Sequence, residues 1–406
     1  MAPTITSKPR ILVLASTYPR WANDTLPPFV HELARRLTAK FEVHVLAPHA
    51  QGAAVRETLD EVEVHRFRYL PEHLETLAYR GGMLPSMRSH PWRLLGLPIF
   101  LFAQMLAIIR MLRRYRFEVV HAHWLFPQGL VAVLSRDISR VRARILCTAH
   151  GADVFALNGI FLRWLKRYTL ARSNKVTAVS QALLIALGRI IATDDRYSVL
   201  PMGVDTRSRF VPGAMARIPG SLLFVGRLAE KKGAIYLLQA LALIKHINGI
   251  CLHIVGSGPE EHNLRIQAKY LNLESIVEFH EAIPNKDLPH WYQISSVLAF
   301  PSITTPYGDQ EGFGLVPVEA LACGCNVVSS DLPAVRDIIK HEKTGLLVPP
   351  GKPAALATAI EKLLTDDELR LALSRAGREF VVDNYDWDHI ATQYILILDQ
   401  LIEMKI

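Results

Sequence analysis

The sequence predicts an α/β protein of two domains, each a doubly wound parallel sheet with helices on both faces. Short runs rich in β-branched residues alternate with helical stretches along all 406 residues. These runs are apolar throughout, which is typical of parallel strands buried on both faces. A stretch rich in Pro and Gly interrupts the pattern near the middle. Each half therefore holds enough strands for a complete Rossmann-like domain.

The expected strands set the domain boundaries. In the first half they cover residues 11–16, 41–48, 62–67, 117–124, 144–151, 175–180 and 198–203, and in the second half residues 222–227, 252–258, 277–281, 297–302, 326–331 and 345–350. The expected domains are 1–203, a linker over 204–220, 221–385, and a last helix over 386–406 that packs back on the first domain. Because open α/β sheets bind ligands beyond the carboxyl ends of their strands, we expect the site in a cleft between the domains.

Charge is distributed unevenly along the chain. The net charge of +8 comes from 46 Lys and Arg against 38 Asp and Glu. Residues 1–210 hold 29 basic and 15 acidic side chains, a balance of +14, and residues 211–406 hold 17 and 23, a balance of −6. A basic first half could meet nucleic acid, anionic lipid or a phosphorylated substrate. Nucleic acid is the poorest fit, because no recognition helix, finger or aromatic sheet motif accompanies the charge.

Cysteine usage and the N-terminus indicate a cytoplasmic protein without a metal. The four cysteines are Cys147, Cys251, Cys323 and Cys325, which suits a reducing compartment. No second Cys/His pair at zinc-site spacing accompanies the last two. The apolar run 11–16 is short, so we interpret it as a first strand and not as a signal peptide.

One segment, 94–112, is apolar enough to suggest a membrane. It contains Pro98, Gln104 and Arg110, and a predicted strand follows almost at once. It barely reaches the roughly 20 apolar residues that a spanning helix needs. We therefore expect a crossover helix buried against the sheet, with a membrane-surface helix as the alternative.

The turn after the strand 222–227 carries an anion-binding pattern. Gly226 ends the strand, and Arg227 and Lys232 lie five residues apart before a helix that begins near Ala234. Backbone N–H groups at a helix start attract anions. An Arg fork beside a Lys point charge suits a diphosphate, and a solvated basic loop is the alternative.

A second turn offers Gly256 and Gly258 after a strand. The third glycine of a dinucleotide fingerprint is missing, which argues against an NAD-dependent oxidoreductase of the same architecture. We interpret this turn as close backbone packing beside a nucleotide.

A third loop places two carboxylates eight residues apart. Glu311 lies in a glycine-rich loop, and Glu319 lies in the helix that follows, within the otherwise apolar run LVPVEALA. Carboxylates accept hydrogen bonds from pairs of sugar hydroxyls, and a charge among apolar residues needs a partner. The two could hold two sugars that flank a phosphate. The alternative is that Glu311 caps the helix and Glu319 faces solvent.

Together these motifs resemble those of glycosyltransferase family 4. The family's donor domain is similar to GRLAEKKG (226–233), VGSGPE (255–260), EGFGLVPVEALACG (311–324) and SDLPAVRDIIKHEKTGLLVPPG (330–351), and its acceptor domain to HAHWLFPQG (121–129), TAHGADV (148–154), AVSQAL (178–183) and LPMGVD (200–205). The resemblance covers essentially the whole chain. It implies the GT-B fold and a retaining, metal-independent glycosyltransferase that needs no cofactor.

The resemblance also assigns roles on the donor side. Arg227 and Lys232 would hold the donor diphosphate, Glu311 the transferred sugar, and Glu319 the nucleotide ribose. Further donor contacts would come from Gly226, Gly256, Ile283, Phe313, Gly314 and Leu315.

On the acceptor side, His150 would lie beside the donor sugar at the reaction centre, with Asp153 nearby. The loop after the first strand departs from the family, because residues 19–28 lack its usual Gly-Gly pair. Asn23, Thr25 or backbone amides near Pro27 could replace that pair. His121 and His123 share a strand face, but we expect them to pack structurally.

The function implied is transfer of a UDP- or GDP-linked sugar to a hydroxyl of a glycan or of a polyprenyl- or other lipid-linked acceptor, in polysaccharide or glycolipid synthesis. A GT-B sugar phosphorylase or synthase and a nonenzymatic sugar-lipid adaptor are the alternatives. Basic amphipathic stretches suit a peripheral contact with an anionic membrane. Their cations are Arg110, Arg113, Arg114, Arg116, Arg163, Lys166, Arg167 and Arg172.

Overall fold

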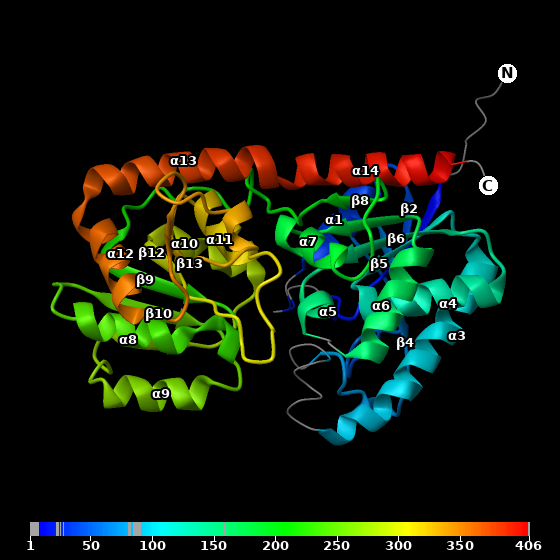
Figure 1. Ribbon diagram of the computed structural model, residues 1–406, viewed down its shortest axis with the longest axis horizontal. Helices are drawn as coiled ribbons and strands as arrows, with labels where there is room; N and C mark the ends of the chain where they lie inside the picture. The colour runs from blue at the N-terminus through cyan, green and yellow to red at the C-terminus, as the bar shows by residue number, and fades with distance from the viewer. Residues whose placement is uncertain are drawn as a thin grey trace. The chain divides into compact units, whose positions relative to one another are not determined.

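The computed structural model describes residues 8–404 apart from 22, 23, 25, 27, 80–82, 84–90, 157 and 158. Asn23 and Thr25 lie outside the described residues. The chain forms two compact units (Figure 1). The first runs up to Val179 and includes Leu183–Leu200 and the chain from Ala391 onward, and the second holds Ser180–Ala182 and Pro201–Ile390.

The first unit is built on an eight-stranded sheet of order β3-β4-β2-β1-β5-β6-β7-β8. Its strands are β1 (Arg10–Leu14), β2 (Glu42–Pro48), β3 (Arg56–Leu59), β4 (Val62–Phe67), β5 (Val119–His123), β6 (Arg144–Ala149), β7 (Lys175–Ala178) and β8 (Tyr197–Val199). Its helical segments are α1 (Phe29–Leu37), η1 (Glu72–Leu74), η2 (Pro91–Gly96), α3 (Leu97–Tyr115), η3 (Leu125–Gly129), α4 (Leu130–Ser139), α5 (Ala152–Phe155), α6 (Ile160–Arg172) and most of α7 (Gln181–Gly188). Helix α4 contacts both α3 and α6 (Figure 1).

Strand β3 is the one strand of this sheet that the sequence pattern did not predict. It pairs antiparallel with β4 at the sheet edge, whereas the other pairs are parallel. The turn between β3 and β4 holds Asp60 at φ 45° and Glu61 at φ 65°. The usual Asn-Gly or Asp-Gly pair of such a turn is absent here, and Thr58 is the only residue of β3 that favours a strand.

The apolar crossover helix is buried along one face only. The expectation of a buried helix was therefore wrong about how much of the helix is covered. Residues Trp92–Tyr115 form a 24-residue helical stretch with mean hydropathy 2.0, long and apolar enough to cross a membrane, a test that core helices also pass. Only 22% of its most apolar part is buried. Phe100 and Ile108 pack inward, but Leu95 is 80% exposed and Phe102 57% exposed.

One of the cations expected on the basic surface is buried. Lys166 on α6 donates a hydrogen bond from Nζ to the carbonyl of Val154 at 2.7 Å. Burial lowers the pKa of Lys166 to about 8. Lys166 therefore ties α6 to the end of α5 and does not belong to the exposed basic set.

The second unit is built on a six-stranded parallel sheet of order β11-β10-β9-β12-β13-β14. Its strands are β9 (Ile218–Val225), β10 (Cys251–Val255), β11 (Val277–His280), β12 (Ser295–Phe300), β13 (Asn326–Ser330) and β14 (Leu346–Val348). Its helical segments are η4 (Glu230–Lys232), α8 (Ala234–Ile244), α9 (Glu261–Tyr270), η5 (Asn285–Asp287), α10 (Leu288–Ile294), α11 (Leu315–Ala322), η6 (Val335–Asp337), α12 (Pro353–Thr365) and α13 (Asp367–Tyr385). Each expected strand of this half is present.

Helices cover both faces of the second sheet. Helices α8, α9 and α12 bury their apolar faces against one side, where Leu237, Leu264 and Ile360 join the core with Leu252 and Ile254 of β10. Helices α10 and α11 contact each other and lie on the other side (Figure 1). This arrangement leaves the loops at the carboxyl ends of the strands free to carry a site.

The last helix, α14 (Trp387–Glu403), starts in the second unit, and its residues from Ala391 belong to the first. Within the first unit, the rings of Tyr394 and His121 lie 5.5 Å apart. Asp399 forms an ion pair with Lys40. These contacts join the end of the chain to the first sheet and to the turn after α1.

Candidate active site

The turn from β9 to α8 has the backbone geometry of a tight anion-binding loop. Gly226 adopts φ 146° and Gly233 adopts φ 66°, conformations that side-chain-bearing residues rarely take. A Cβ on Gly233 would lie 2.0 Å from the carbonyl oxygen of Pro301. The segment η4 between the two glycines ends at Lys232, one residue before the turn into α8. Lys232 is thereby fixed beside the start of a helix, as the sequence predicted.

The turn after β10 packs directly on the turn after β9. Gly256 adopts φ 142°, and a Cβ there would lie 2.1 Å from the carbonyl oxygen of Gly226. A Cβ on Gly258 would lie 2.3 Å from the carbonyl oxygen of Leu228. The two glycines serve close backbone packing, which fits the interpretation made from the missing third glycine.

Lys232 and Glu311 form the charged centre of the second unit's candidate site. Lys232 Nζ lies 2.8 Å from Glu311 Oε1, and both side chains are largely buried. Burial alone would raise the pKa of Glu311, but the Lys232 and Lys231 cations outweigh it and hold that pKa below the usual range. The Lys232 ammonium also lies 5.0 Å from the ring centroid of Phe300. The structure thus brings together two residues that stand 79 positions apart in the sequence.

Arg227 lies beside this centre in the sequence and is partly exposed. Its guanidinium is about half buried, and this desolvation lowers the pKa of Arg227. An Arg in this position stays charged, because the ordinary pKa of a guanidinium lies far above neutral pH. Lys231 points to a different carboxylate, with Nζ 3.2 Å from Asp309 Oδ1.

Helix α11 begins where the sequence predicted an anion-receiving helix start. Gly314 adopts φ 118° immediately before Leu315, the first helical residue. The Phe313 side chain is buried, with its ring 5.5 Å from that of Tyr385, so only its backbone is available to a ligand. The carbonyl of Gly312 accepts a hydrogen bond from Ser180 Oγ at 2.7 Å.

Glu319 has the partners that its apolar surroundings require. Tyr292 donates its hydroxyl hydrogen to Oε2 at 2.8 Å, and Asn285 donates an amide hydrogen to Oε1 at 3.2 Å. Burial raises the pKa of Glu319 to about 7 despite these bonds. Glu319 is 7% exposed, so it does not face solvent freely.

Ile283, one of the expected donor contacts, is linked to Glu319 through Asn285. Ile283 is half buried in the stretch after β11, two residues before Asn285. The bond from Asn285 to Glu319 therefore joins the segment of Ile283 to helix α11. Sequence reasoning missed Tyr292 and Asn285, because hydroxyl and amide donors on another element carry no pattern of their own.

His150 lies at the end of β6 in the first unit, within an aromatic cluster. Its Nε2 is 2.9 Å from Nδ1 of His123, and its ring lies 4.8 Å from Trp124 and 5.3 Å from Phe29. Burial lowers the pKa of His150 to about 3. The imidazole is therefore neutral at physiological pH. One of its ring nitrogens donates a hydrogen bond and the other accepts one.

Asp153 holds the turn that carries His150. Its carboxylate accepts backbone N–H groups of His150 at 3.1 Å, Gly151 at 2.8 Å and Leu125 at 2.8 Å. Burial raises the pKa of Asp153. These bonds fix the turn after β6 against the start of η3, so Asp153 positions the backbone at His150.

His121 and His123 are buried next to this turn. His121 Nε2 lies 2.8 Å from the Thr148 hydroxyl, and the two histidine rings lie 4.2 Å apart. Burial lowers the pKa of His121 to about 3. His123 contacts His150 and is therefore a neighbour of the candidate site. The spacing of His123 from His121 in the sequence did not indicate this contact.

Comparison with known proteins identifies the family. The model of Glycosyltransferase Family 4 matches residues 28–208, and the model of Glycosyl transferases group 1 matches residues 219–399. The GDP-mannose-dependent alpha-(1-6)-phosphatidylinositol monomannoside mannosyltransferase of Mycolicibacterium smegmatis is 30% identical over 378 residues, 89% of this chain and 90% of that protein. The chain belongs to glycosyltransferase family 4. It is a transferase of the EC 2.4 class.

Other relatives and solved structures agree with this assignment. The putative colanic acid biosynthesis glycosyltransferase WcaL of Escherichia coli is 28% identical over 294 residues, 71% of each chain. Sucrose-phosphate synthase from Thermosynechococcus elongatus superposes with a TM-score of 0.80 at 23% identity, over 98% of this chain and 100% of that one. The Anabaena HepE structure with UDP-glucose gives 0.74 at 18%, over 96% and 99%. These structures establish that the glycosyltransferase has the GT-B fold.

Proposed function

We propose that this family 4 glycosyltransferase moves a sugar from a nucleotide-diphosphate sugar to a hydroxyl group of a glycan or lipid-linked acceptor, with retention of anomeric configuration. The observation that carries the proposal is the Lys232–Glu311 pair at 2.8 Å, held between two glycine-bounded turns. In this proposal the Lys232 cation binds the diphosphate and the Glu311 carboxylate binds sugar hydroxyls, and the short distance between them suits a donor in which the two are adjacent.

The chemistry of this pair suits a donor in which a sugar is attached to a diphosphate. The Lys ammonium has three hydrogens, so it can keep Glu311 and still donate to a phosphate oxygen. Glu311 is ionised and accepts hydrogen bonds only, as sugar hydroxyls require. As the bond from sugar to phosphate breaks, negative charge grows on the diphosphate. Lys232, Arg227 and the amides around Gly314 stabilise it without the need for a metal or cofactor.

His150 and Glu319 complete the proposed roles. Glu319 holds the ribose hydroxyls, with its orientation fixed by Tyr292 and Asn285. The neutral imidazole of His150 hydrogen-bonds the transferred sugar, and Asp153 keeps the turn of His150 in place. Gly226, Gly256 and the backbone of Ile283, Phe313 and Leu315 line the donor site in this proposal.

The relatives guide the choice of donor and acceptor to test first. The Mycolicibacterium relative is named as GDP-mannose-dependent and acts on a phosphatidylinositol monomannoside. The test is acceptor-dependent release of nucleoside diphosphate from GDP-mannose and from UDP-glucose, with the product anomer assigned by NMR. We expect one donor to yield a glycoside of retained configuration. Transfer only to or from inorganic phosphate would instead support the phosphorylase, and transfer to a free sugar the synthase.

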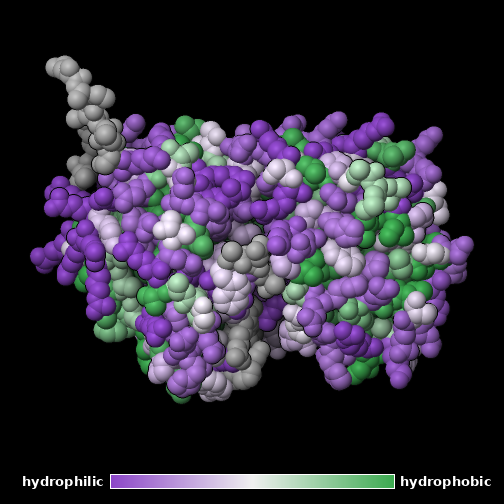
Figure 2. Space-filling view, turned by 180° about the vertical axis from the view of Figure 1, so that it is seen from behind, coloured by the Kyte–Doolittle hydropathy of each residue, from purple (hydrophilic) through white to green (hydrophobic). Residues whose placement is uncertain are grey.

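We also propose that the first unit meets an anionic membrane, where a lipid-linked acceptor would be found. Six apolar side chains near the N-terminal ends of the η2–α3 stretch and of α6 are between 51% and 93% exposed: Trp92, Leu94, Leu95, Ile160, Phe161 and Trp164. The exposed cations Arg163 and Arg167 lie on the same helix α6. On the face drawn in Figure 2, hydrophilic side chains predominate and hydrophobic ones form small separate patches.

A further inference from the structure

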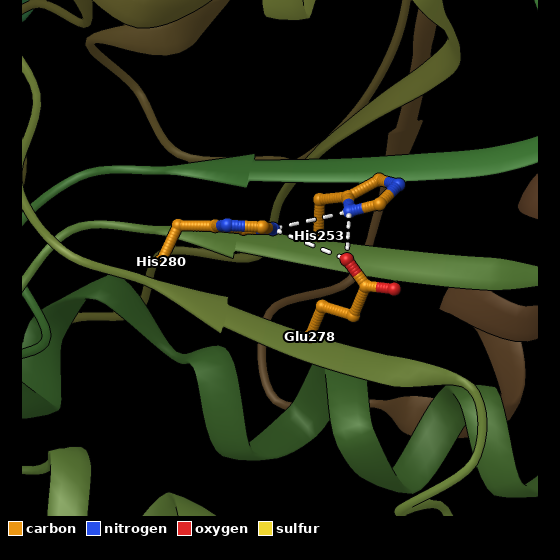
Figure 3. A group of neighbouring side chains, drawn as sticks. All are labelled: His253, Glu278 and His280. Carbon is orange, nitrogen blue, oxygen red and sulfur yellow. Dashed lines mark hydrogen bonds and ion pairs between the residues drawn. The ribbon is translucent and has the colours of Figure 1, made fainter.

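Two histidines and a glutamate converge at the edge of the second unit's sheet. His253 lies on β10, and Glu278 and His280 lie on the edge strand β11 (Figure 3). The strands are parallel, with His253 opposite Glu278. Opposite residues share a face, and so do residues two apart on one strand. The strand register alone therefore brings the three side chains to one face.

The ligand atoms of these side chains form a small, nearly equilateral triangle. His253 Nδ1 is 3.2 Å from His280 Nε2, Glu278 Oε2 is 3.3 Å from His253 Nδ1, and the third side measures 3.5 Å. A tetrahedral zinc ion binds nitrogen and oxygen at roughly 2.0–2.1 Å, which sets its ligand atoms about 3.3–3.4 Å apart. The triangle has the size of one face of such a tetrahedron.

We propose that His253, Glu278 and His280 bind a divalent transition-metal ion, with Zn²⁺ as the first candidate and water at the fourth position. Two imidazoles and one carboxylate are a donor set of zinc sites with an open position, whereas Mg²⁺ and Ca²⁺ take oxygen ligands. Oε2 of Glu278 faces both ring nitrogens at once, and each dashed line in Figure 3 joins two of the three ligand atoms.

The two histidine rings are held from outside the triangle. The ring of Trp291 on α10 lies 4.5 Å from His280 and 5.2 Å from His253. Cys251 Sγ lies 3.8 Å from Nε2 of His253, the nitrogen that does not face the triangle. Outer contacts of this kind orient metal-binding imidazoles. Glu278 is 66% exposed at its side chain, so an ion can enter from its side.

A second histidine pair, in the first unit, has the same spacing but, among the described residues, no carboxylate facing both ring nitrogens. His44 Nδ1 lies 3.2 Å from His65 Nε2, the same spacing on neighbouring strands. There the nearby carboxylate, Glu42, contacts the opposite nitrogen of His44. Within the described part of the chain, His253, Glu278 and His280 are the group whose three ligand atoms all lie within 4.8 Å of one another.

The proposed ion would fasten an edge strand next to the donor turns. Strand β11 has four residues, and its one neighbour in the six-stranded sheet is β10. The carbonyl of His280 accepts the N–H of Gly256 at 3.0 Å. Metal binding would therefore stabilise β11 and the turn of Gly256, and we assign it no part in sugar transfer.

The test uses the full chain without a histidine tag, stripped by a chelator and then desalted. Zn²⁺ affinity is measured by competition with a chromophoric chelator, and Co²⁺ gives the visible absorption of the site. The variants are Glu278→Gln, at an exposed residue, and His280→Asn. The matched controls are Glu361→Gln, which removes a half-exposed carboxylate 3.9 Å from His246, and His65→Asn.

We expect the wild type and both controls to bind one Zn²⁺ per chain and to unfold at a higher temperature with it. Each triad variant should lose about tenfold or more in affinity, since even outer-shell changes cost 10–100-fold. It should also lose the tetrahedral Co²⁺ spectrum. Absence of stoichiometric binding by the wild type, or equal affinity in the triad variants, would overturn the proposal. The variants' unfolding temperatures without metal show whether they are folded.

Discussion

Among single residues, the Lys232 ammonium is the group on which the proposed donor site depends. It contacts Glu311 at 2.8 Å and stands over Phe300. We expect Lys232→Ala to lower kcat by about 10²–10³-fold, the cost of one donor aimed at developing charge. Steady-state release of nucleoside diphosphate measures this effect.

The neighbouring cation supplies the control. Lys231 pairs with Asp309 and acts on Glu311 only as a further cation, so Lys231→Ala should lower kcat much less than Lys232→Ala does. Lys232→Ala also leaves Glu311 buried without its cation, which destabilises by about 3 kcal/mol or more when such a partner is lost. Assays must therefore be run below the variant's unfolding temperature. Near-normal turnover of folded Lys232→Ala would remove Lys232 from the mechanism.

If Glu319 holds the donor ribose as proposed, donor binding should depend on pH with a sign set by the raised pKa of Glu319. Its pKa is raised to about 7 by burial, so the carboxylate takes up a proton as the pH falls through 7. Only the ionised form accepts from both ribose hydroxyls. We expect KM for the donor to rise about tenfold between pH 8 and pH 6, as the ionised fraction falls. Glu319→Gln should raise KM and flatten this profile, and a variant with the wild-type profile would contradict the assignment.

The raised pKa of Glu319 also affects the stability of the fold, which is greater when Glu319 is protonated. Because the folded-state pKa of Glu319 lies above its ordinary value of 4.5, the folded protein binds this proton more tightly than the unfolded chain does. The contribution of Glu319 to stability is full below about pH 4.5 and is lost as the pH rises through 7. Substrate binding thus needs the form of Glu319 that stabilises the fold less.

Among secondary-structure elements, the turns after β9 and β10 pack closely on each other beside the proposed donor site. Gly256→Ala would place a Cβ 2.1 Å from the carbonyl oxygen of Gly226 at φ 142°. We expect a loss of about 3 kcal/mol from strain and overpacking, measured by denaturant unfolding. Gly188 at the end of α7 has open space around it, so Gly188→Ala should be neutral or slightly stabilising. Equal stability of the two variants would show that the turns are not tightly packed.

Strands and glycine turns could be predicted from the sequence better than contacts between elements could. The buried parallel strands were found because their apolar runs are continuous, and the glycine turns because their φ angles demand glycine. Strand β3 was missed because it is an exposed edge with a glycine-free turn at Asp60 and Glu61. The partners of Glu319 and the triad of His253, Glu278 and His280 join separate elements. Cys/His spacing along the chain cannot reveal them, because β10 and β11 bring them together only through pairing.

For the molecule as a whole, the membrane proposal combines the basic first half with the exposed apolar residues of the η2–α3 stretch and α6. We expect the enzyme to pellet with anionic vesicles at low salt and to detach from them at high salt. It should not pellet with zwitterionic vesicles. The double change Arg163→Glu and Arg167→Glu should release it, while Arg265→Glu, on the second unit, should not. Protein that stays in the supernatant with anionic vesicles would leave these side chains as ordinary surface.

In the proposed mechanism, Lys232 binds the diphosphate of the donor and does not contact its nucleoside. Calorimetric titration of the wild type and Lys232→Ala with a nucleoside diphosphate and with the matching nucleoside measures this contact. We expect the variant to lose affinity for the diphosphate by at least about tenfold while its affinity for the nucleoside is unchanged, because the cation meets phosphate only. An equal loss for both ligands, or no loss for either, would contradict it.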